Sequence, residues 1–207
     1  MILVFTFVSL WIEALWPLVI SAVVTFLFLL ATARNDWTEK SVFGKANTLT
    51  AFRLLAVFYL ALYGFQLNNY LILGIGLLIL ILDGVDGWLA KRNHETSDFG
   101  AYFDKETDAF FMLILCLLAI GKGLIWSWVV LLGLMRYLFA IFLFLYKTEV
   151  KAERRSQVGR IIYIIVVSAL LSAFLPYPVI YQPAILIATV LLGYSFSRDI
   201  LWILKKG

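Results

Sequence analysis

The chain has 207 residues, of which 63% are hydrophobic, 16% are aromatic and only 14% are charged. Its mean hydropathy is +0.97, whereas an average soluble domain is about half apolar and about one quarter charged. This composition excludes a soluble globular enzyme. The net charge of +4 favours contact with anionic lipid and not with nucleic acid. The lone cysteine, Cys116, excludes an intrachain disulfide.

Apolar segments long enough to cross a bilayer follow one another along most of the chain. A membrane-spanning helix needs about 20 mostly apolar residues. By this rule the sequence predicts an all-α integral membrane protein, a single membrane-embedded unit with seven spans, at residues 2–32, 47–65, 69–90, 104–120, 124–146, 158–175 and 183–204. The first of these segments is interrupted only by Glu13 and Pro17, and we interpret it as one span.

The basic residues are distributed unequally between the two sides of these spans. Of the 17 Lys and Arg residues, fourteen fall on one side, Lys122 alone falls on the other, and Arg53 and Arg136 lie within spans. Short cytoplasmic loops carry the excess of Lys and Arg in membrane proteins. We therefore predict that the C-terminus is cytoplasmic and that the N-terminus lies outside.

Four aspartates gather near the cytoplasmic ends of the third and fourth predicted spans. Asp83 and Asp86 are three residues apart, and Asp104 and Asp108 are four apart. Residues at these spacings share one face of a helix. Two antiparallel helices joined by a short loop can bring all four carboxylates together. Charged groups within a span are costly, and they are therefore rare unless they face a cavity and serve a function, which makes this cluster a candidate site.

Four like charges in a partly desolvated site repel one another unless protons or cations bind to them. The ligands are oxygen atoms only, with no nearby cysteine, which favours Mg²⁺, Mn²⁺ or Ca²⁺ over Zn²⁺. A pair of such ions about 3.5–4 Å apart is a common arrangement for activating phosphates. Small residues beside the carboxylates, Gly87, Ala90 and Gly100, leave room for a ligand or a neighbouring backbone.

These residues resemble the signature of the CDP-alcohol phosphotransferases, also called CDP-alcohol phosphatidyltransferases, D-x-x-D-G-x-x-A-R-x8-G-x3-D-x3-D. Residues 83–108 agree at seven of its eight fixed positions, and Lys91 replaces the Arg. A second similarity to the family is the N-x-x-T-x-x-R pattern of Asn47, Thr50 and Arg53. The resemblance implies a six-helix catalytic membrane domain at residues 47–207. Residues 1–46 then form an extra N-terminal transmembrane helix and a cytoplasmic linker.

The resemblance also implies an activity and roles for the matching residues. The enzyme would transfer a substituted phosphate from a CDP-linked donor to an alcohol and release CMP, with two Mg²⁺ or Mn²⁺ ions at the cytoplasmic membrane surface. Asp108 would be the general base and also lie at the second ion. The implied metal ligands are Asp83, Asp86, Asp104 and Asp108, and the implied donor-binding residues are Thr50, Asp86, Gly87, Ala90, Lys91 and Gly100. A homodimer is expected on the resemblance alone.

Basic residues outside the motif are candidates for binding the acceptor or its phosphate. Arg136 lies in mid-span, about ten residues or 15 Å from the cytoplasmic end of its helix. It either lines an acceptor pocket or neutralises a buried carboxylate such as Asp83 or Asp86. Arg154, Arg155 and Arg160 would bind an acceptor phosphate. Alternatively, they only contribute to the excess of positive charge on the cytoplasmic side and to the attraction to anionic lipid headgroups.

The sequence is compatible with several functions. CDP-diacylglycerol with a small polar alcohol is favoured by the compact chain and the basic cytoplasmic groups, and the alternative within the family is a soluble CDP-alcohol with diacylglycerol as acceptor. A Mg²⁺-dependent membrane prenyltransferase also uses aspartates to hold a diphosphate, but with a different Asp spacing. A cation transporter would place its carboxylates near the membrane midplane and not at helix ends.

Overall fold

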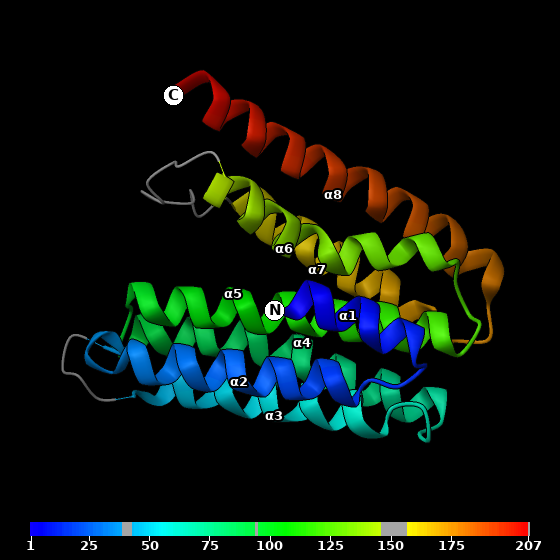
Figure 1. The fold of residues 1–207 in the computed structure, drawn as a ribbon, viewed down its shortest axis with the longest axis horizontal. Coiled ribbons are helices and arrows are strands. Elements are labelled where there is room, and N and C mark those ends of the chain that lie inside the picture. Colours follow the sequence, from blue (N-terminus) through cyan, green and yellow to red (C-terminus); the bar gives the residue numbers. More distant parts are fainter. Residues whose placement is uncertain (39–42, 94, 146–156, 207) are drawn as a thin grey trace. The chain divides into compact units, whose positions relative to one another are not determined.

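The computed structural model describes residues 1–38, 43–93, 95–145 and 157–206. All the regular secondary structure of these residues is helical, as predicted (Figure 1). In chain order they are α1 (Ile2–Trp11), α2 (Trp16–Thr32), η1 (Arg34–Asp36), α3 (Lys45–Tyr63), α4 (Asn69–Arg92), α5 (Asp98–Gly121), η2 (Ser127–Val129), α6 (Val130–Leu145), α7 (Gln157–Ser172) and α8 (Pro178–Lys206), where η marks a short 3-10 helix.

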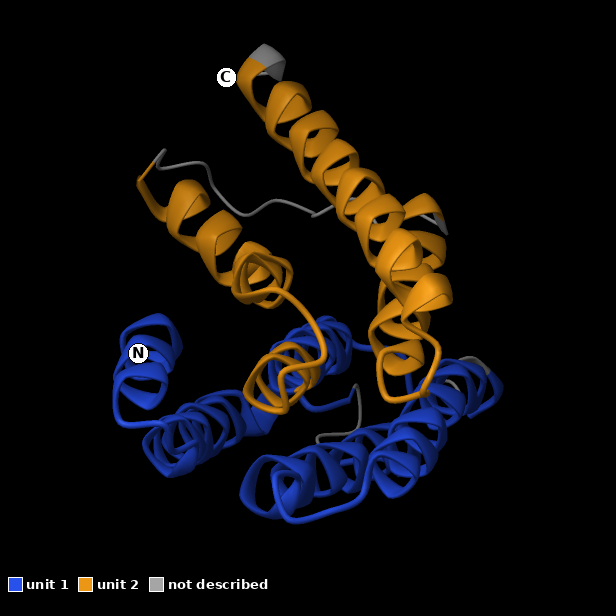
Figure 2. Cartoon of the chain, turned by 90° about the vertical axis from the view of Figure 1, so that its right-hand side faces the viewer, with its two compact units in different colours: residues 1–114 blue, residues 115–207 orange. Residues whose placement is uncertain are grey.

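The chain divides into two compact units, Met1–Ile114 and Leu115–Gly207 (Figure 2). The first unit contains α1 to α4 and most of α5, and it therefore carries the whole aspartate motif. The second unit contains the end of α5 and α6 to α8. The division expected from the sequence, between residues 46 and 47, stays a prediction.

Within the described part of the chain, four helical segments are long and apolar enough to cross a membrane: Lys45–Tyr63, Asn69–Ala90, Ser127–Leu145 and Pro178–Leu204. Large apolar side chains lie exposed on the helices, among them Phe28, Phe52 and Leu55, which are each more than 60% exposed. Contiguous exposed apolar surface is unfavourable in water and suits contact with lipid. These features suggest an integral membrane protein, as the composition predicts.

The single N-terminal span predicted over residues 2–32 is wrong, because the structure contains two helices there. The chain runs out along α1 and back along α2, with Glu13 in a left-handed conformation (φ 54°) at the turn (Figure 1). Pro17 lies in the first turn of α2, where its missing N–H costs nothing, whereas it would interrupt a continuous helix. Ser9 fastens the two helices because its Oγ accepts a hydrogen bond from the Leu18 N–H (3.1 Å).

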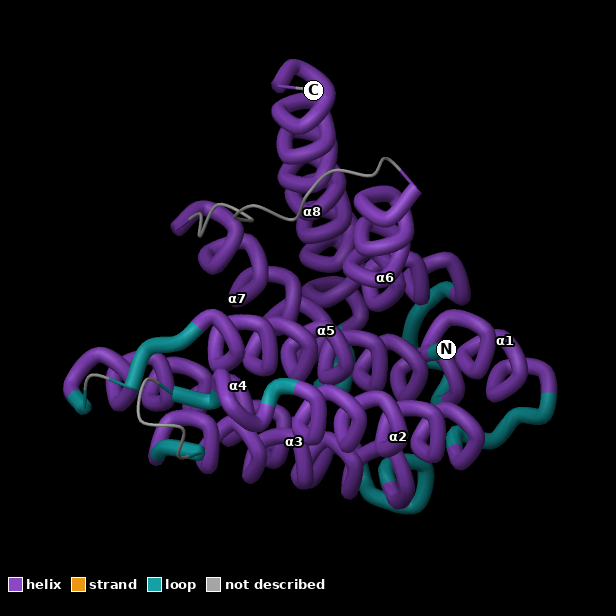
Figure 3. Tube along the Cα trace, turned by 60° about the vertical axis from the view of Figure 1, so that its left-hand side comes forward, coloured by secondary structure: helices purple, strands orange, loops and turns teal. Residues whose placement is uncertain are grey.

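Several helix ends are set by side chains that bind unpaired backbone groups. Asn68 Oδ1 accepts a hydrogen bond from the Leu71 N–H (2.8 Å), so α4 begins at the predicted residue. Ser97 Oγ accepts from the Gly100 N–H (2.9 Å), and α5 therefore begins at Asp98, six residues before the predicted Asp104. Figure 3 shows the helices in purple and the described parts of the connecting segments in teal.

The last helix also differs from the prediction. It begins at Pro178 and continues through Pro183, where the sequence predicts it to start. Pro183 is the sixth residue of α8, and its missing N–H removes the one intrahelical hydrogen bond that it would have donated to the Val179 carbonyl. In the same unit, the Tyr181 hydroxyl donates to the Leu124 carbonyl (3.0 Å), and α7 packs against α8.

An aromatic cluster joins three helices of the first unit. Phe26 of α2 lies 6.0–6.3 Å, between ring centroids, from Phe58 of α3 and from Phe103 and Phe110 of α5, in edge-to-face arrangements. Such pairs add about 0.5–1.5 kcal/mol each beyond the burial of area. The cluster holds α2 and α3 against the helix that carries two of the four aspartates.

The start of α3 is bound to the segment between α4 and α5. Gly44 has a φ of 78°, which a side chain would strain, and it precedes the first turn of α3. Glu95 Oε2 accepts hydrogen bonds from the backbone N–H groups of Lys45 (2.7 Å) and Ala46 (3.2 Å). A carboxylate at this position accepts from two backbone N–H groups that have no partner within the helix. Its negative charge also interacts favourably with the positive end of the helix dipole. Glu95 therefore fixes α3 relative to the motif helices.

We predict that Glu95→Ala lowers the free energy of unfolding by about 1–2 kcal/mol, because it removes an N-terminal cap together with its charge. Glu95→Gln retains an acceptor oxygen, so its free energy of unfolding should fall by roughly half as much. The measurement is denaturant-induced unfolding of the purified protein in detergent. Equal stability of Glu95→Ala and the wild type would contradict this role.

Candidate active site

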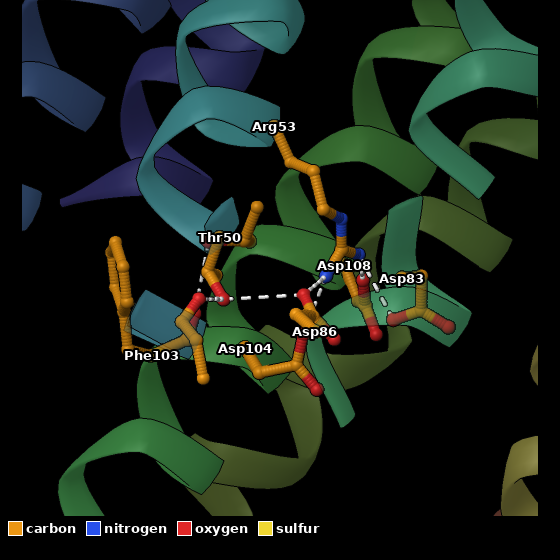
Figure 4. Close-up of polar contacts among 9 residues, drawn as sticks. Thr50, Arg53, Asp83, Asp86, Phe103, Asp104 and Asp108 are labelled. Atoms are coloured by element: carbon orange, nitrogen blue, oxygen red, sulfur yellow. Dashed lines mark hydrogen bonds and ion pairs between the residues drawn. The ribbon is translucent and has the colours of Figure 1, made fainter. Parts of the chain in front are cut away.

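The four motif aspartates converge in the structure from two helices. Asp83 and Asp86 lie one turn apart near the C-terminal end of α4, and Asp104 and Asp108 lie one turn apart near the N-terminal end of α5 (Figure 4). The oxygen atoms that Asp83, Asp104 and Asp108 can offer to a metal lie within 4.8 Å of one another. The helical periodicity thus places the carboxylates together, as predicted.

Arg53 of α3 binds all four carboxylates. Its Nη1 lies 2.5 Å from Asp86 Oδ2 and 2.7 Å from Asp104 Oδ1. Its Nη2 lies 3.0 Å from Asp83 Oδ1 and also pairs with Asp108 Oδ1. Figure 4 shows the side chain reaching from α3 toward the aspartates of α4 and α5. One guanidinium therefore connects three helices.

Thr50, one turn before Arg53, extends this polar face of α3. Its hydroxyl donates to Asp86 Oδ2 across 3.2 Å and also lies 3.2 Å from the Ala46 carbonyl oxygen (Figure 4). Thr50 and Asp86 are both buried. The predicted donor-binding residue Thr50 is thus in direct contact with the predicted metal ligand Asp86.

The site has a closed side and an open side. The side chains of Asp83 and Asp86 are 7% and 5% exposed, whereas those of Asp104 and Asp108 are 35% and 17% exposed. Anything that binds from outside reaches the α5 carboxylates first. The closed side faces Arg53, which is fully buried.

The residues present fit a divalent cation. Four ionised carboxylates and one guanidinium sum to a charge of −3, so the pairing with Arg53 leaves most of the negative charge uncompensated. Like charges held this close need further cations or protons. Carboxylate oxygens are the ligands that Mg²⁺, Mn²⁺ and Ca²⁺ prefer. Asp83, Asp104 and Asp108 could therefore hold such an ion.

Gly100 allows α5 to approach α3 closely. A Cβ atom at this position would lie 2.8 Å from Asn47 Oδ1 and 3.1 Å from Ser97 Oγ. Asn47 is buried, and its Nδ2 donates to the Trp37 carbonyl (3.0 Å), which also accepts from Ser97 Oγ (2.8 Å). The Asn47 side chain therefore fills the space beside Gly100, and its hydrogen bond to Trp37 holds it there.

The other predicted site residues are spread over the chain. Gly87 and Ala90 lie on α4 and are half-buried. Arg136 lies half-buried in the middle of α6, and Arg160 is exposed in the first turn of α7. Arg154, Arg155 and the side chain of Lys91 lie outside the described residues. The roles predicted for these seven residues therefore stay predictions.

A comparison with known protein families identifies the family to which this chain belongs. The sequence model of the CDP-alcohol phosphatidyltransferases matches residues 43–195. The chain belongs to this family. Comparison with curated proteins and with solved structures finds no match. As a member of the family, this phosphatidyltransferase is a transferase of substituted phosphate groups, and α1 and α2 precede the matched residues.

Two polar residues of the site were not assigned a role from the sequence. Arg53 is a charged residue inside a predicted span, three residues from Thr50, and this signal would have placed it on the same face as the candidate site. It supplies the guanidinium that contacts Asp83 and Asp86. Asn47 opens the same N-x-x-T-x-x-R pattern, but its contacts could not be predicted because they depend on how α3 meets α5.

We predict that Gly100→Ala destabilises the protein by about 1–3 kcal/mol, because the added methyl group overlaps Asn47 Oδ1 in a packed region. The effect should be smaller in an Asn47→Ala background. The matched control is Gly84→Ala, since nothing lies within 4 Å of a Cβ atom there and alanine favours the helix. Detergent-based unfolding measures all four variants. A Gly100→Ala protein as stable as Gly84→Ala would contradict the close approach.

Proposed function

We propose that this phosphatidyltransferase transfers a phosphatidyl group from CDP-diacylglycerol to the hydroxyl of a small polar alcohol and releases CMP, as a step of phospholipid biosynthesis. The observation that carries the proposal is the convergence of four carboxylates on one guanidinium among apolar helices. A diphosphate is the ligand for which such a site, once loaded with divalent cations, has the matching charge.

The reaction makes one bond and breaks one. The acceptor oxygen bonds to the phosphorus that carries diacylglycerol, and the bond between this phosphorus and the oxygen of the leaving CMP breaks. Asp108 takes the proton of the acceptor hydroxyl as general base. Its partial exposure supports this role, because a polar acceptor must reach the base from outside the helices.

The proposed cofactors are two divalent cations, either Mg²⁺ or Mn²⁺. Asp83, Asp86, Asp104 and Asp108 would hold them, and their charge would offset that of the diphosphate and of the departing CMP. The burial of Asp83 and Asp86 supports their role as fixed ligands, since their side chains cannot exchange freely with water.

The donor is expected to lie along the α4 face that continues from Asp86. Gly87 and Ala90 lack bulk there, and Lys91 supplies a positive charge for a phosphate. Thr50 would contact the nucleotide with the hydroxyl that now donates to Asp86. Gly100 would contribute through the close approach of α5 that it permits.

A site near the cytoplasmic membrane surface suits both substrates. A lipid donor stays in the bilayer while a polar acceptor enters from water, and the excess of Lys and Arg supports the cytoplasmic side. Arg136, Arg154, Arg155 and Arg160 are the proposed acceptor or phosphate contacts. The proposed assembly is a homodimer in contact with membrane lipids.

The test is CMP release by the purified full chain with CDP-diacylglycerol, Mn²⁺ or Mg²⁺, and one acceptor at a time from inositol phosphate, glycerol 3-phosphate, serine and choline. CDP-choline with diacylglycerol tests the other direction within the family. We predict that one CDP-diacylglycerol pair releases CMP and that Asp108→Asn lowers its rate at least about 100-fold, because general base catalysis is lost.

The matched control is Asp199→Asn, an aspartate of α8 that pairs with the neighbouring Arg198 and should leave turnover unchanged. Turnover only with CDP-choline and diacylglycerol would reverse the proposed substrates. No CMP from any pair, with a folded wild-type protein, would overturn the proposal. Unchanged turnover in Asp108→Asn would remove Asp108 from the reaction.

A further inference from the structure

Arg53 is a buried charged group that the proposed reaction does not use. It is fully buried, and its two terminal nitrogens contact one oxygen from each of the four aspartates. Its Nε has no hydrogen-bond partner within the described part of the chain. The side chain therefore meets the carboxylates with the end of its guanidinium alone.

The guanidinium pairs with the same carboxylates that are the candidate metal ligands. Nη2 binds Asp83 and Asp108, and Nη1 binds Asp104, which are the three residues whose oxygens lie close enough to share an ion. A divalent cation and the guanidinium thus draw on the same carboxylates. Because both are positive, each lowers the affinity of the other for this group.

Without any cation the arrangement of the aspartates would be unfavourable. Asp83 and Asp86 are buried, so water does little to screen their charges. Arg53 offsets one of the four negative charges and pairs with all four carboxylates. Leaving buried charges without a partner is strongly destabilising.

We infer that Arg53 is a built-in counter-ion, which holds the four carboxylates together in the metal-free protein and competes with the divalent cation for them. Arg53 is thus a positioning residue that acts through Asp83, Asp86, Asp104 and Asp108. The inference rests on the proposed function for the existence of the metal site. It adds that this chain sets its own metal affinity through a residue of α3.

The experiment measures Mn²⁺ binding by electron paramagnetic resonance and thermal unfolding with and without Mn²⁺, on the purified full chain in detergent. Arg53→Gln should melt at a lower temperature than the wild type without metal, yet bind Mn²⁺ about tenfold more tightly or better, since a nearby positive charge has been removed. Mn²⁺ should therefore raise its melting temperature more than that of the wild type.

Two controls separate charge from structure. Arg53→Lys keeps the charge and should bind Mn²⁺ within a few-fold of the wild type. Arg92→Gln removes a positive charge that lies over the ring of Trp88 (4.8 Å) and should leave Mn²⁺ affinity unchanged. A purely structural role would lower stability and Mn²⁺ affinity together in Arg53→Gln, and this result would overturn the inference.

A charge-balanced variant covers the case in which Arg53→Gln does not fold. Adding Asp86→Asn removes one negative charge with the positive one, and should restore folding and metal-free stability relative to Arg53→Gln. A double variant less stable than Arg53→Gln would overturn the counter-ion role. If the wild type binds Mn²⁺ and Arg53→Gln binds it no more tightly, only this inference fails. If neither protein binds Mn²⁺, the metal part of the proposed function fails with it.

Discussion

The mutual repulsion of four buried or half-buried carboxylates is the constraint on which the first unit depends. Asp83 and Asp86 are buried and Asp104 and Asp108 are only partly exposed, so water screens their charges incompletely. Arg53 stabilises the arrangement because it reaches all four from a third helix. The carboxylates can therefore be assembled before any substrate arrives, and a charge of −3 remains to attract cations.

This pairing requires that α3 be held accurately against α4 and α5, and the contacts at the start of α3 meet the requirement. Glu95 binds the first two N–H groups of the helix, and Asn47 and Ser97 both donate to the carbonyl of Trp37. Gly100 then lets α5 come close to Asn47. Because these groups lie one or two turns from Thr50 and Arg53, a shift at the start of α3 would move the guanidinium away from the carboxylates.

Local periodicity predicted the helices and the convergence of the aspartates, because spacings of three and four residues place side chains on one face wherever the helix lies. It could not predict the partner of the aspartates, since the place of Arg53 depends on how α3 packs against two other helices. The first span was predicted wrongly because hydropathy alone does not register a turn. Glu13 and Pro17 were visible in the sequence, but the reversal itself appears only in the structure, where α1 packs against α2 and the Leu18 N–H donates to Ser9 Oγ.

The N-terminal segment, which precedes the part of the chain that matches the family, takes part in the packing behind the site. Phe26 of α2 is almost fully buried against Phe103, the residue before Asp104, and against Phe110, two residues after Asp108. Trp37 supplies the carbonyl that Asn47 and Ser97 share, and Phe43 packs against Trp37 and Phe103. Successive residues of a helix point to different faces, so one face of α5 can carry carboxylates while another is buried in aromatic rings. In this chain Phe26, Trp37 and Phe43 therefore support the helix that presents Asp104 and Asp108.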